Sequence, residues 1–387
     1  MDDIHNKVEL SVLENSRLMK LIKPYIYGLT LLLTLGTSCQ EHTKKQMDTT
    51  TITNTGTNAP ITTDKFYWQE TISCPTGYPI DVYHGSLEWD GGSTSLYLGT
   101  HGGPWGITGR SMSSGVKGVP KHLDVIWLSY AEDTFYHVDT AIDYDKMVRL
   151  FREGYPSKDA NGEMRNEKYN YIVVGMAPGG VVVIWLSGPG RQVEVGRYKG
   201  DKIVIPAEEI AQLDSHEKLL FSSEYRKEIM ENEKIVPKEF QHKNKNQSIP
   251  FHLWDSYRER YSWRPVFVVQ NEGKMEDVFF ANFNGEQEEI IKENIPTADY
   301  VSRAIPNTFN FGWRAANGKR YGGTVKFDEK EIVAAFSEIH KVDKKANIEI
   351  EFRVNQLNTF ITVVLKSNGK EIPLTNSDVK VYESRKK

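Results

Sequence analysis

The sequence predicts an α+β protein, built from antiparallel β-sheets with a few packed helices. Beyond Lys65, apolar residues alternate with period two in short runs between turn signals, a pattern typical of strands with one buried face. Helical periodicity follows Asp143 and Asp328, and aspartate is a favoured N-cap residue. The sequence lacks the regular alternation of strand and helix that would indicate a parallel sheet.

The composition is that of a folded chain. The 387 residues carry a formal net charge of −4, with 39% hydrophobic and 26% charged residues. This balance excludes a disordered chain. The sequence also lacks the excess of Lys and Arg that would indicate a nucleic-acid partner. The two cysteines, Cys39 and Cys74, exclude a disulfide scaffold and a cysteine-cluster zinc site.

A short apolar run, Tyr25 to Gly36, follows Lys20 and Lys23. It is too short for a transmembrane helix, which needs ~20 residues, and it suits the ~7–15 residues of a signal-peptide core. We therefore expect residues 1–38 to be an export signal. Residues before Met19 have mixed charge, so Met19 is the expected start of translation.

The signal ends on Thr37-Ser38-Cys39, which resembles a bacterial lipobox, although Gly36 stands where a stricter motif carries Leu. We expect cleavage before Cys39 and lipidation of its thiol. A plain secretory signal or a short anchor is the alternative. Several acyl chains give stable anchoring, so the predicted location is the bacterial cell envelope, on the periplasmic or surface side of a membrane.

Residues 39–64 form the expected tether. This segment is rich in threonine and nearly free of apolar residues, so it cannot bury enough surface to fold. Once Cys39 carries lipid, no internal disulfide is expected, and Cys74 is interpreted as an inert buried thiol.

The first α+β half is expected over residues 65–204. Strands are predicted at Ile80 to Trp89, Ser95 to Gly99 and Leu123 to Tyr130. A hairpin joins Tyr171 to Val174 with Val181 to Leu186, because the intervening glycines supply the positive φ angles of a tight turn.

A helical connector is expected over residues 205–264, ending in a helix from Pro250 to Trp263. The second α+β half then covers residues 265–387. Its predicted strands are Val266 to Gln270, Val278 to Phe283, Phe352 to Val354 and Phe360 to Leu365.

The two halves share residues at a constant offset of 185 positions. A tryptophan also begins each preceding hairpin, with one residue of slippage. We predict two copies of a hairpin–helix–hairpin module, over about 122–204 and 307–383; convergent patterning is the alternative. The matching pairs are Tyr136 and Tyr321, Ile142 and Phe327, Asp143 and Asp328, Val148 and Val333, and Phe151 and Phe336.

The segment Leu123 to Tyr130, followed by Phe135-Tyr136 and by the glycine-containing hairpin of 174–186, resembles the uncharacterised bacterial lipoproteins known as domain of unknown function 2931. The likeness is good over about 75–210 and loose elsewhere. It implies a lipid-anchored envelope protein of unknown activity, with immunity to a neighbouring toxin as one role of such proteins, and it implies no active-site residue.

Motifs of catalysis are missing from the sequence. The nearest approach to a hydrolase elbow, Gly109 to Ser113, ends in serine where glycine is needed. The segment Gly312 to Arg320 does not match the phosphate-loop motif, because it has one residue too many and ends in Arg where Ser or Thr is needed. It is better interpreted as a hairpin with its turn at Asn317-Gly318. No H-E-x-x-H pair is present. We therefore expect no enzymatic activity, no cofactor and no metal.

The most unusual polar segment is the glycine-rich stretch Gly99 to Arg110, which carries His101, Trp105 and Arg110. Loops on a rigid sheet often hold recognition residues, and Trp and Arg are favoured interface anchors, so these three are the candidate partner-binding residues. The alternative is a connection that folds Trp105 back onto the core.

A second aromatic and basic cluster lies at 254–264. At helical spacing Trp254, Tyr257 and Tyr261 share one face, which favours packing against a sheet, and the arginines are expected to pair with nearby acids.

Together these patterns predict a membrane-anchored envelope lipoprotein that binds another protein without catalysis, with toxin neutralisation as one form of that role. The alternative function is a carbohydrate- or small-ligand-binding module, suggested by the many tryptophans and tyrosines on predicted strands and loops.

Overall fold

The computed structural model describes residues 64–97, 99–158, 163–270 and 272–384. The predicted signal peptide, Cys39 and nearly all of the predicted tether lie outside the described residues. Among those that are described, no helix is both long enough and apolar enough to cross a bilayer.

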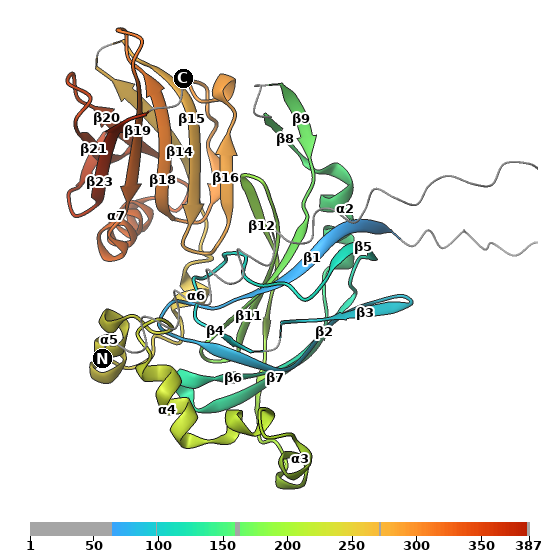
Figure 1. The fold of residues 1–387 in the computed structure, drawn as a ribbon. Coiled ribbons are helices and arrows are strands. Elements are labelled where there is room, and N and C mark those ends of the chain that lie inside the picture. Colours follow the sequence, from blue (N-terminus) through green and yellow to red (C-terminus); the bar gives the residue numbers. More distant parts are fainter. Residues whose placement is uncertain (1–63, 98, 159–162, 271, 385–387) are drawn as a thin grey trace, which may run out of the picture. The chain divides into compact units, whose positions relative to one another are not determined.

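The first half is a sandwich of two β-sheets (Figure 1). One sheet has the order β13-β7-β6-β2-β3, with β4 also paired to β2, and the other has the order β12-β11-β10-β1-β5. The strands of the first sheet are β2 (Ile80–Trp89), β3 (Gly92–Ser95), β4 (Thr100–His101), β6 (His122–Ser129), β7 (Thr134–Ala141) and β13 (Asp201–Ile203). Those of the second are β1 (Lys65–Ser73), β5 (Ser114–Gly118), β10 (Tyr171–Ala177), β11 (Val181–Gly188) and β12 (Arg191–Lys199).

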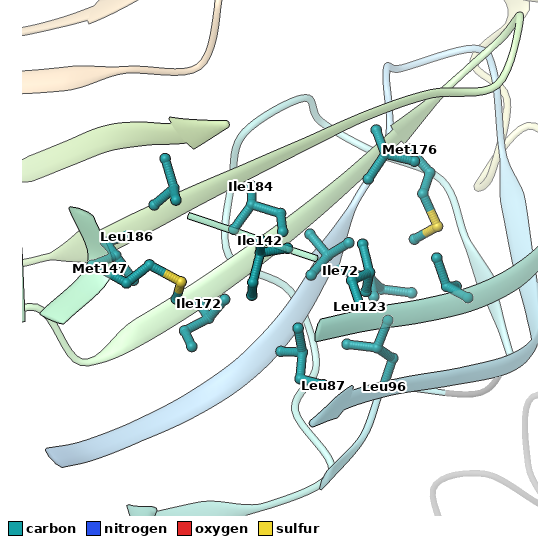
Figure 2. Packing of buried hydrophobic residues seen from close by; sticks show 14 of the residues in the cluster. Ile72, Leu87, Leu96, Leu123, Ile142, Met147, Ile172, Met176, Ile184 and Leu186 are labelled. Carbon is teal, nitrogen blue, oxygen red and sulfur yellow. The ribbon is translucent and has the colours of Figure 1, made fainter. Parts of the chain in front are cut away.

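The core of this half lies between the two sheets. Figure 2 shows Leu87 and Leu123 of the first sheet near Ile72, Ile172 and Ile184 of the second, and all five are fully buried. The alternating apolar pattern of each strand therefore points one face inward. Three further elements complete the half: η1 (Tyr130–Glu132), helix α2 (Tyr144–Glu153), and the small sheet of β8 (Tyr155–Lys158) and β9 (Met164–Glu167).

The second half repeats this strand order. Its sheets are β23-β19-β18-β15-β16 and β22-β21-β20-β14-β17. The first of these contains β15 (Lys274–Asn282), β16 (Gln287–Ile290), β18 (Pro306–Arg314), β19 (Arg320–Lys326) and β23 (Asp378–Glu383). The second contains β14 (Tyr261–Val269), β17 (Val301–Arg303), β20 (Asn347–Val354), β21 (Ile361–Ser367) and β22 (Lys370–Leu374), and the half also holds η3 (Lys292–Asn294) and helix α7 (Glu329–Val342).

Equivalent contacts recur in the two halves. Trp127 stacks on Tyr136 across β6 and β7, with ring centroids 5.4 Å apart, and Trp313 stacks on Tyr321 across β18 and β19, 5.8 Å apart. In both halves the register of the neighbouring strand also breaks just after the residue opposite this tryptophan. The break follows Val82 on β2, opposite Trp127, and Met275 on β15, opposite Trp313.

A second pair of tryptophans is also equivalent. The indole of Trp68 on β1 donates to the carbonyl of Gly118, and that of Trp263 on β14 donates to the carbonyl of Ala304. Each ring lies beside a cation from the adjacent edge of the sheet, Lys117 or Arg303.

The two halves join through one sheet. β12 pairs with β16 at Arg191 and Gln192, opposite Glu288 and Gln287, and this pairing makes a continuous ten-stranded sheet.

The connector is helical and covers the outer faces of the first half. Its elements are α3 (Ala207–Gln212), η2 (Glu217–Phe221), α4 (Ser223–Glu231), α5 (Lys238–Asn246) and α6 (Leu253–Ser256). Ile229 of α4 packs on Leu128 and Phe135, on the outer side of the first sheet. Trp254 of α6 packs on Val183 and Trp185, on the outer side of the second.

The α+β class is therefore correct in its coarse form, and the protein is mainly β. Two pairings are parallel, β1 with β10 and β14 with β20, which the expectation of antiparallel sheets missed. In both cases the partners are far apart in the sequence, with the other sheet's hairpin and a helix between them, so no short βαβ pattern reveals them.

Some boundaries also differ from the sequence prediction. The strand expected at Ser95 to Gly99 is instead β3, which begins at Gly92 directly after the turn at Gly91. The helix expected up to Trp263 ends near Ser256, and β14 begins at Tyr261, because Tyr261 and Trp263 alternate with the half-exposed Ser262. The turn at Asn317-Gly318 is present, with Gly318 at φ 81°.

Candidate functional site

The glycine-rich segment lies across the outer face of β1. The backbone N–H of Gly106 donates to Ser73 Oγ at 2.8 Å, and that of Gly109 donates to Thr71 Oγ1 at 2.7 Å. Both hydroxyls belong to the face of β1 that points away from the sandwich core. The segment is therefore held by its backbone in one position, although most of it has no regular secondary structure.

Trp105 folds back from this segment onto the sheet. Its ring meets that of Trp185 edge to face, 4.9 Å between centroids, and it belongs to the apolar cluster around Val183 and Trp254. Its indole nitrogen is buried and has no hydrogen-bond partner among the described residues. The geometry thus shows the alternative position considered for Trp105, half-buried against the core.

Position 106 of this segment requires glycine. Its φ is 71°, and a Cβ there would lie 2.6 Å from the Cα of Gly285, which belongs to the second half. The Gln192 side chain donates to the carbonyl oxygens of both Gly106 and Gly285, at 2.5 and 2.6 Å. The segment therefore also helps to join the two halves.

His101 and Arg110 lie at the two ends of the segment. The carbonyl of His101 accepts a hydrogen bond from the buried Cys74 thiol at 3.2 Å, and burial raises the pKa of that thiol. Burial, together with the charge of Arg110, lowers the pKa of His101. The His101 side chain is half-buried, and its Nε2 has no hydrogen-bond partner among the described residues.

Arg110 remains accessible. Its guanidinium donates to the Tyr97 hydroxyl at 2.8 Å and lies over the Tyr97 ring, 5.6 Å from the centroid. It makes no ion pair within the part of the chain that the structure describes. An exposed, unpaired arginine that an aromatic ring holds in place is well suited to contact a partner.

Exposed apolar side chains occur close to Arg110 in the sequence and on the strands β1 and β5 that flank the segment. Tyr67 is 55% exposed, Ile107 39%, Met112 52% and Val116 68%. Tyr67 and Val116 are direct cross-strand neighbours on β1 and β5, and Ile107 lies between the two glycines that bind β1. We call Tyr67, Ile107, Arg110, Met112 and Val116 the loop face.

Sequence reasoning found only Arg110 of this face. The other members are ordinary strand or loop residues whose side is set by the pairing of β1 with β5. Tyr67 alternates with the buried Trp68, so the period-two pattern permits its exposure, but the sequence did not indicate that β5 ends the sheet.

The aromatic cluster at 254–264 divides between two cores. Trp254 and Tyr257 pack on the outer face of the sheet as predicted, while Tyr261 lies on β14 and packs in the second sandwich. The predicted ion pairs are all present: Arg258 with Glu194, Arg260 with Glu286 and Arg264 with Glu349.

A cleft of about 670 Å³ lies beside the joint between β12 and β16, and it was not predicted. Arg303 binds Glu288 through two hydrogen bonds of 2.9 Å, and Arg191 lies 3.5 Å from the same carboxylate. Burial opposes ionisation of Glu288, but the two arginines outweigh it and lower its pKa. The buried Nε of Arg191 has no hydrogen-bond partner among the described residues.

Histidine and aspartate pairs occur on the outer face of the first sheet. Asp124 lies 2.8 Å from His137 and 3.6 Å from His84. Within the described ranges, no group of three or more His, Cys, Asp or Glu side chains is arranged to hold a metal ion.

The fold defines a class of protein: two β-sandwiches that share one sheet, with a glycine-rich loop fixed across the first. A family model described as a protein of unknown function (DUF2931) matches residues 42–252, more than half of the chain, and the chain belongs to that family. No curated protein matches the chain. No solved structure matches it either.

Proposed function

We propose that this protein is a membrane-anchored envelope lipoprotein that binds another protein without catalysing a reaction, and that the loop face is the contact. The observation that supports this most is the exposure of four large apolar side chains on β1, on β5 and on the chain between them that carries an unpaired arginine, a segment whose backbone is fixed to β1. Exposed apolar patches of this kind mark interaction sites.

Rigidity favours such a role. A loop already held in one conformation loses little entropy on binding, so more of the contact energy appears as affinity. The complementary surface of the partner would be an apolar patch with a carboxylate placed opposite Arg110. A toxin that the protein neutralises is the partner class that the sequence resemblance favours.

Recovery of the partner from native membranes tests this proposal. The pair Ile107→Ser and Arg110→Ala removes one apolar and one charged contact without touching the core, and we expect it to lose the partner that wild type recovers. Val342→Ser is the matched control, since Val342 is 83% exposed on α7. Equal recovery with both variants would reject the loop face. Trp105→Ala is unsuitable, because it also removes packing on Trp185.

The anchor is a separate part of the proposal. Acylation of Cys39 would hold the chain on a membrane, and the acidic and basic residues removed with residues 1–38 balance, so the mature chain keeps its net charge of −4. Cys39→Ser should move the protein from the membrane to the soluble fraction and abolish incorporation of labelled palmitate. Unchanged membrane association of this variant would exclude lipid anchoring.

Small-ligand binding is the second candidate function, and the cleft beside Arg191 favours it. The tryptophans offer little surface to a carbohydrate, because six of the eight are buried and the other two are half-buried. A cleft ligand would instead accept a hydrogen bond from the Nε of Arg191. Screening of small carboxylic acids by ligand-observed NMR, with Arg191→Gln as control, would detect it.

We also propose that the two halves are copies of one module, larger than the hairpin–helix–hairpin unit expected from the sequence. Support comes from the equal strand order and from the equivalent Trp127–Tyr136 and Trp313–Tyr321 pairs. An experimental structure in which β1, β2, β6, β7, β10 and β11 fail to superimpose on β14, β15, β18, β19, β20 and β21 would contradict this duplication.

A further inference from the structure

Strand β14 has an uncovered edge. β20 pairs with it along nearly its whole length, but on the opposite side β17 pairs only from Tyr261 to Trp263. From Arg264 to Val269, no strand in the described part of the chain lies on that side. Uncovered edges of this kind bind extended peptides when they are not otherwise protected.

The backbone orientation at this edge follows from alternation. The N–H of Gln270 donates to the carbonyl of Val354 on β20, so the even-numbered positions that precede it face β20. The backbone groups of the odd-numbered positions therefore face the uncovered side, and these positions are Pro265, Phe267 and Val269. Proline has no N–H to donate, and within sheets it occurs where no ladder bond is needed. Phe267 directs both its N–H and its C=O outward.

The same edge is covered in the first half. Trp68 of β1 is the counterpart of Trp263, and there β5 pairs with β1 from Lys65 to Gln69, one residue past this tryptophan, whereas β17 stops at Trp263 itself. The chain just before β5 then binds the next residue, because the N–H groups of Met112 and Ser113 donate to the Glu70 carboxylate. One half thus covers with its own chain the edge that the other half leaves open.

A groove of about 540 Å³ runs beside the uncovered edge. Its walls are formed by β14, by the start of β15 and by the segment from Lys292 to Ala298. The apolar side chains that line it include Val266, Phe267, Met275, Ile295 and Pro296.

The rim of this groove is basic. Lys274 is exposed and makes no ion pair with any described residue, while Lys292 only approaches Glu276 at 4.0 Å. The one acid of the groove, Glu293, is already paired with Lys158 at 2.6 Å. The rim therefore has positive charge that its own carboxylates do not neutralise.

We propose that this groove binds an extended peptide segment of a partner protein by strand addition to β14. The peptide takes the place that β17 leaves vacant and exchanges backbone hydrogen bonds with Phe267. It places an apolar side chain against Met275 and Ile295, and its acidic side chains lie near Lys274 and Lys292. Backbone pairing gives affinity, and the pocket and the lysines select an acidic, apolar sequence.

Fluorescence anisotropy with synthetic peptides tests the proposal. The probe is a labelled eight-residue peptide that alternates valine and glutamate, and a second probe has the same sequence with alternate backbone nitrogens methylated. Wild type should bind the first and lose the second, because methylation removes the N–H groups that pair with β14. A peptide alternating valine and lysine should bind at least about tenfold more weakly.

Matched variants locate the site. The pair Lys274→Glu and Lys292→Glu should weaken binding of the acidic peptide about tenfold, since it replaces attraction by repulsion. The pair Lys341→Glu and Lys344→Glu, at exposed lysines at the end of α7 and just beyond it, makes the same charge change and should have no effect. Ile107→Ser with Arg110→Ala should also leave peptide affinity unchanged, which separates this site from the loop face.

Three results would overturn the proposal. The first is equal binding of the methylated and unmethylated peptides, and the second is equal binding by wild type and the Lys274→Glu, Lys292→Glu variant. The third is saturable binding of laurate that Lys274→Glu weakens, in the absence of peptide binding, which would assign the groove to an anionic amphiphile instead.

Discussion

At the residue scale, buried polar groups hold the first half and its loop in register. Asp81 on β2 is 4% exposed, and its carboxylate accepts hydrogen bonds from Thr100 at 2.7 Å and from Tyr130 at 3.2 Å. Thr100 begins the segment that carries the loop face. Burial raises the pKa of Asp81 to about 6, although both hydroxyls favour the ionised form.

This raised pKa makes stability depend on pH. Between the ordinary aspartate pKa near 4 and about 6, the folded state keeps a proton that the unfolded chain has released, so the stabilisation present below pH 4 is lost as pH rises to 6. Relative to Asp81→Asn, wild type should lose on the order of 3 kcal/mol of unfolding free energy over this range. Urea unfolding at several pH values measures it, and parallel profiles for the two proteins would contradict it.

Gly106 gives a second prediction at this scale. Alanine there would suffer both a positive φ and a clash with the backbone of Gly285. Gly91 has a similar φ of 87° but open space around it, so Gly91→Ala should cost only about 1 kcal/mol. Gly106→Ala should cost clearly more in urea unfolding. Equal costs would show that the close approach to Gly285 contributes nothing to stability.

At the element scale, helix caps and the β10–β11 hairpin could be predicted from local signals, whereas the pairing of strands far apart in the sequence could not. Asp143 and Asp328 were predicted as N-caps, and both accept a hydrogen bond from the third residue of their helix, at 3.0 and 2.9 Å. The hairpin from β10 to β11 was also predicted, because its glycines and alternating valines lie close together in sequence. The parallel pairing of β1 with β10 depends on residues about a hundred positions apart, which no local pattern encodes.

The caps can be tested as a pair. Asp143→Ala and Asp328→Ala should each lower the unfolding free energy by about 1 kcal/mol, because each leaves a backbone N–H of the first helical turn without its acceptor. Similar losses are expected because α2 and α7 occupy equivalent places in the two halves. Asp145→Ala is the control, since Asp145 lies in the first turn but accepts no cap bond. A control effect as large as that of Asp143→Ala would indicate a general charge effect instead.

At the scale of the whole molecule, the two sandwiches are joined by a short edge pairing that the glycine-rich segment reinforces. The sequence indicated that this segment was unusual and that it carried Trp105 and Arg110, but it did not show which of them stays exposed. That choice depends on Trp185, on a strand eighty residues away. The neighbours of Arg110 on the loop face were missed for a similar reason, since they are exposed only because β5 ends the sheet.

We propose above all that the loop face contacts a protein partner at the membrane. Site-specific photo-crosslinking in native membranes tests it most directly, with a photoreactive residue at position 107 and a control at position 342, where the native valine is also exposed. We expect one discrete adduct from position 107, lost in the Arg110→Ala background, and none from position 342. No adduct at 107, or the same adducts from both positions, would contradict it.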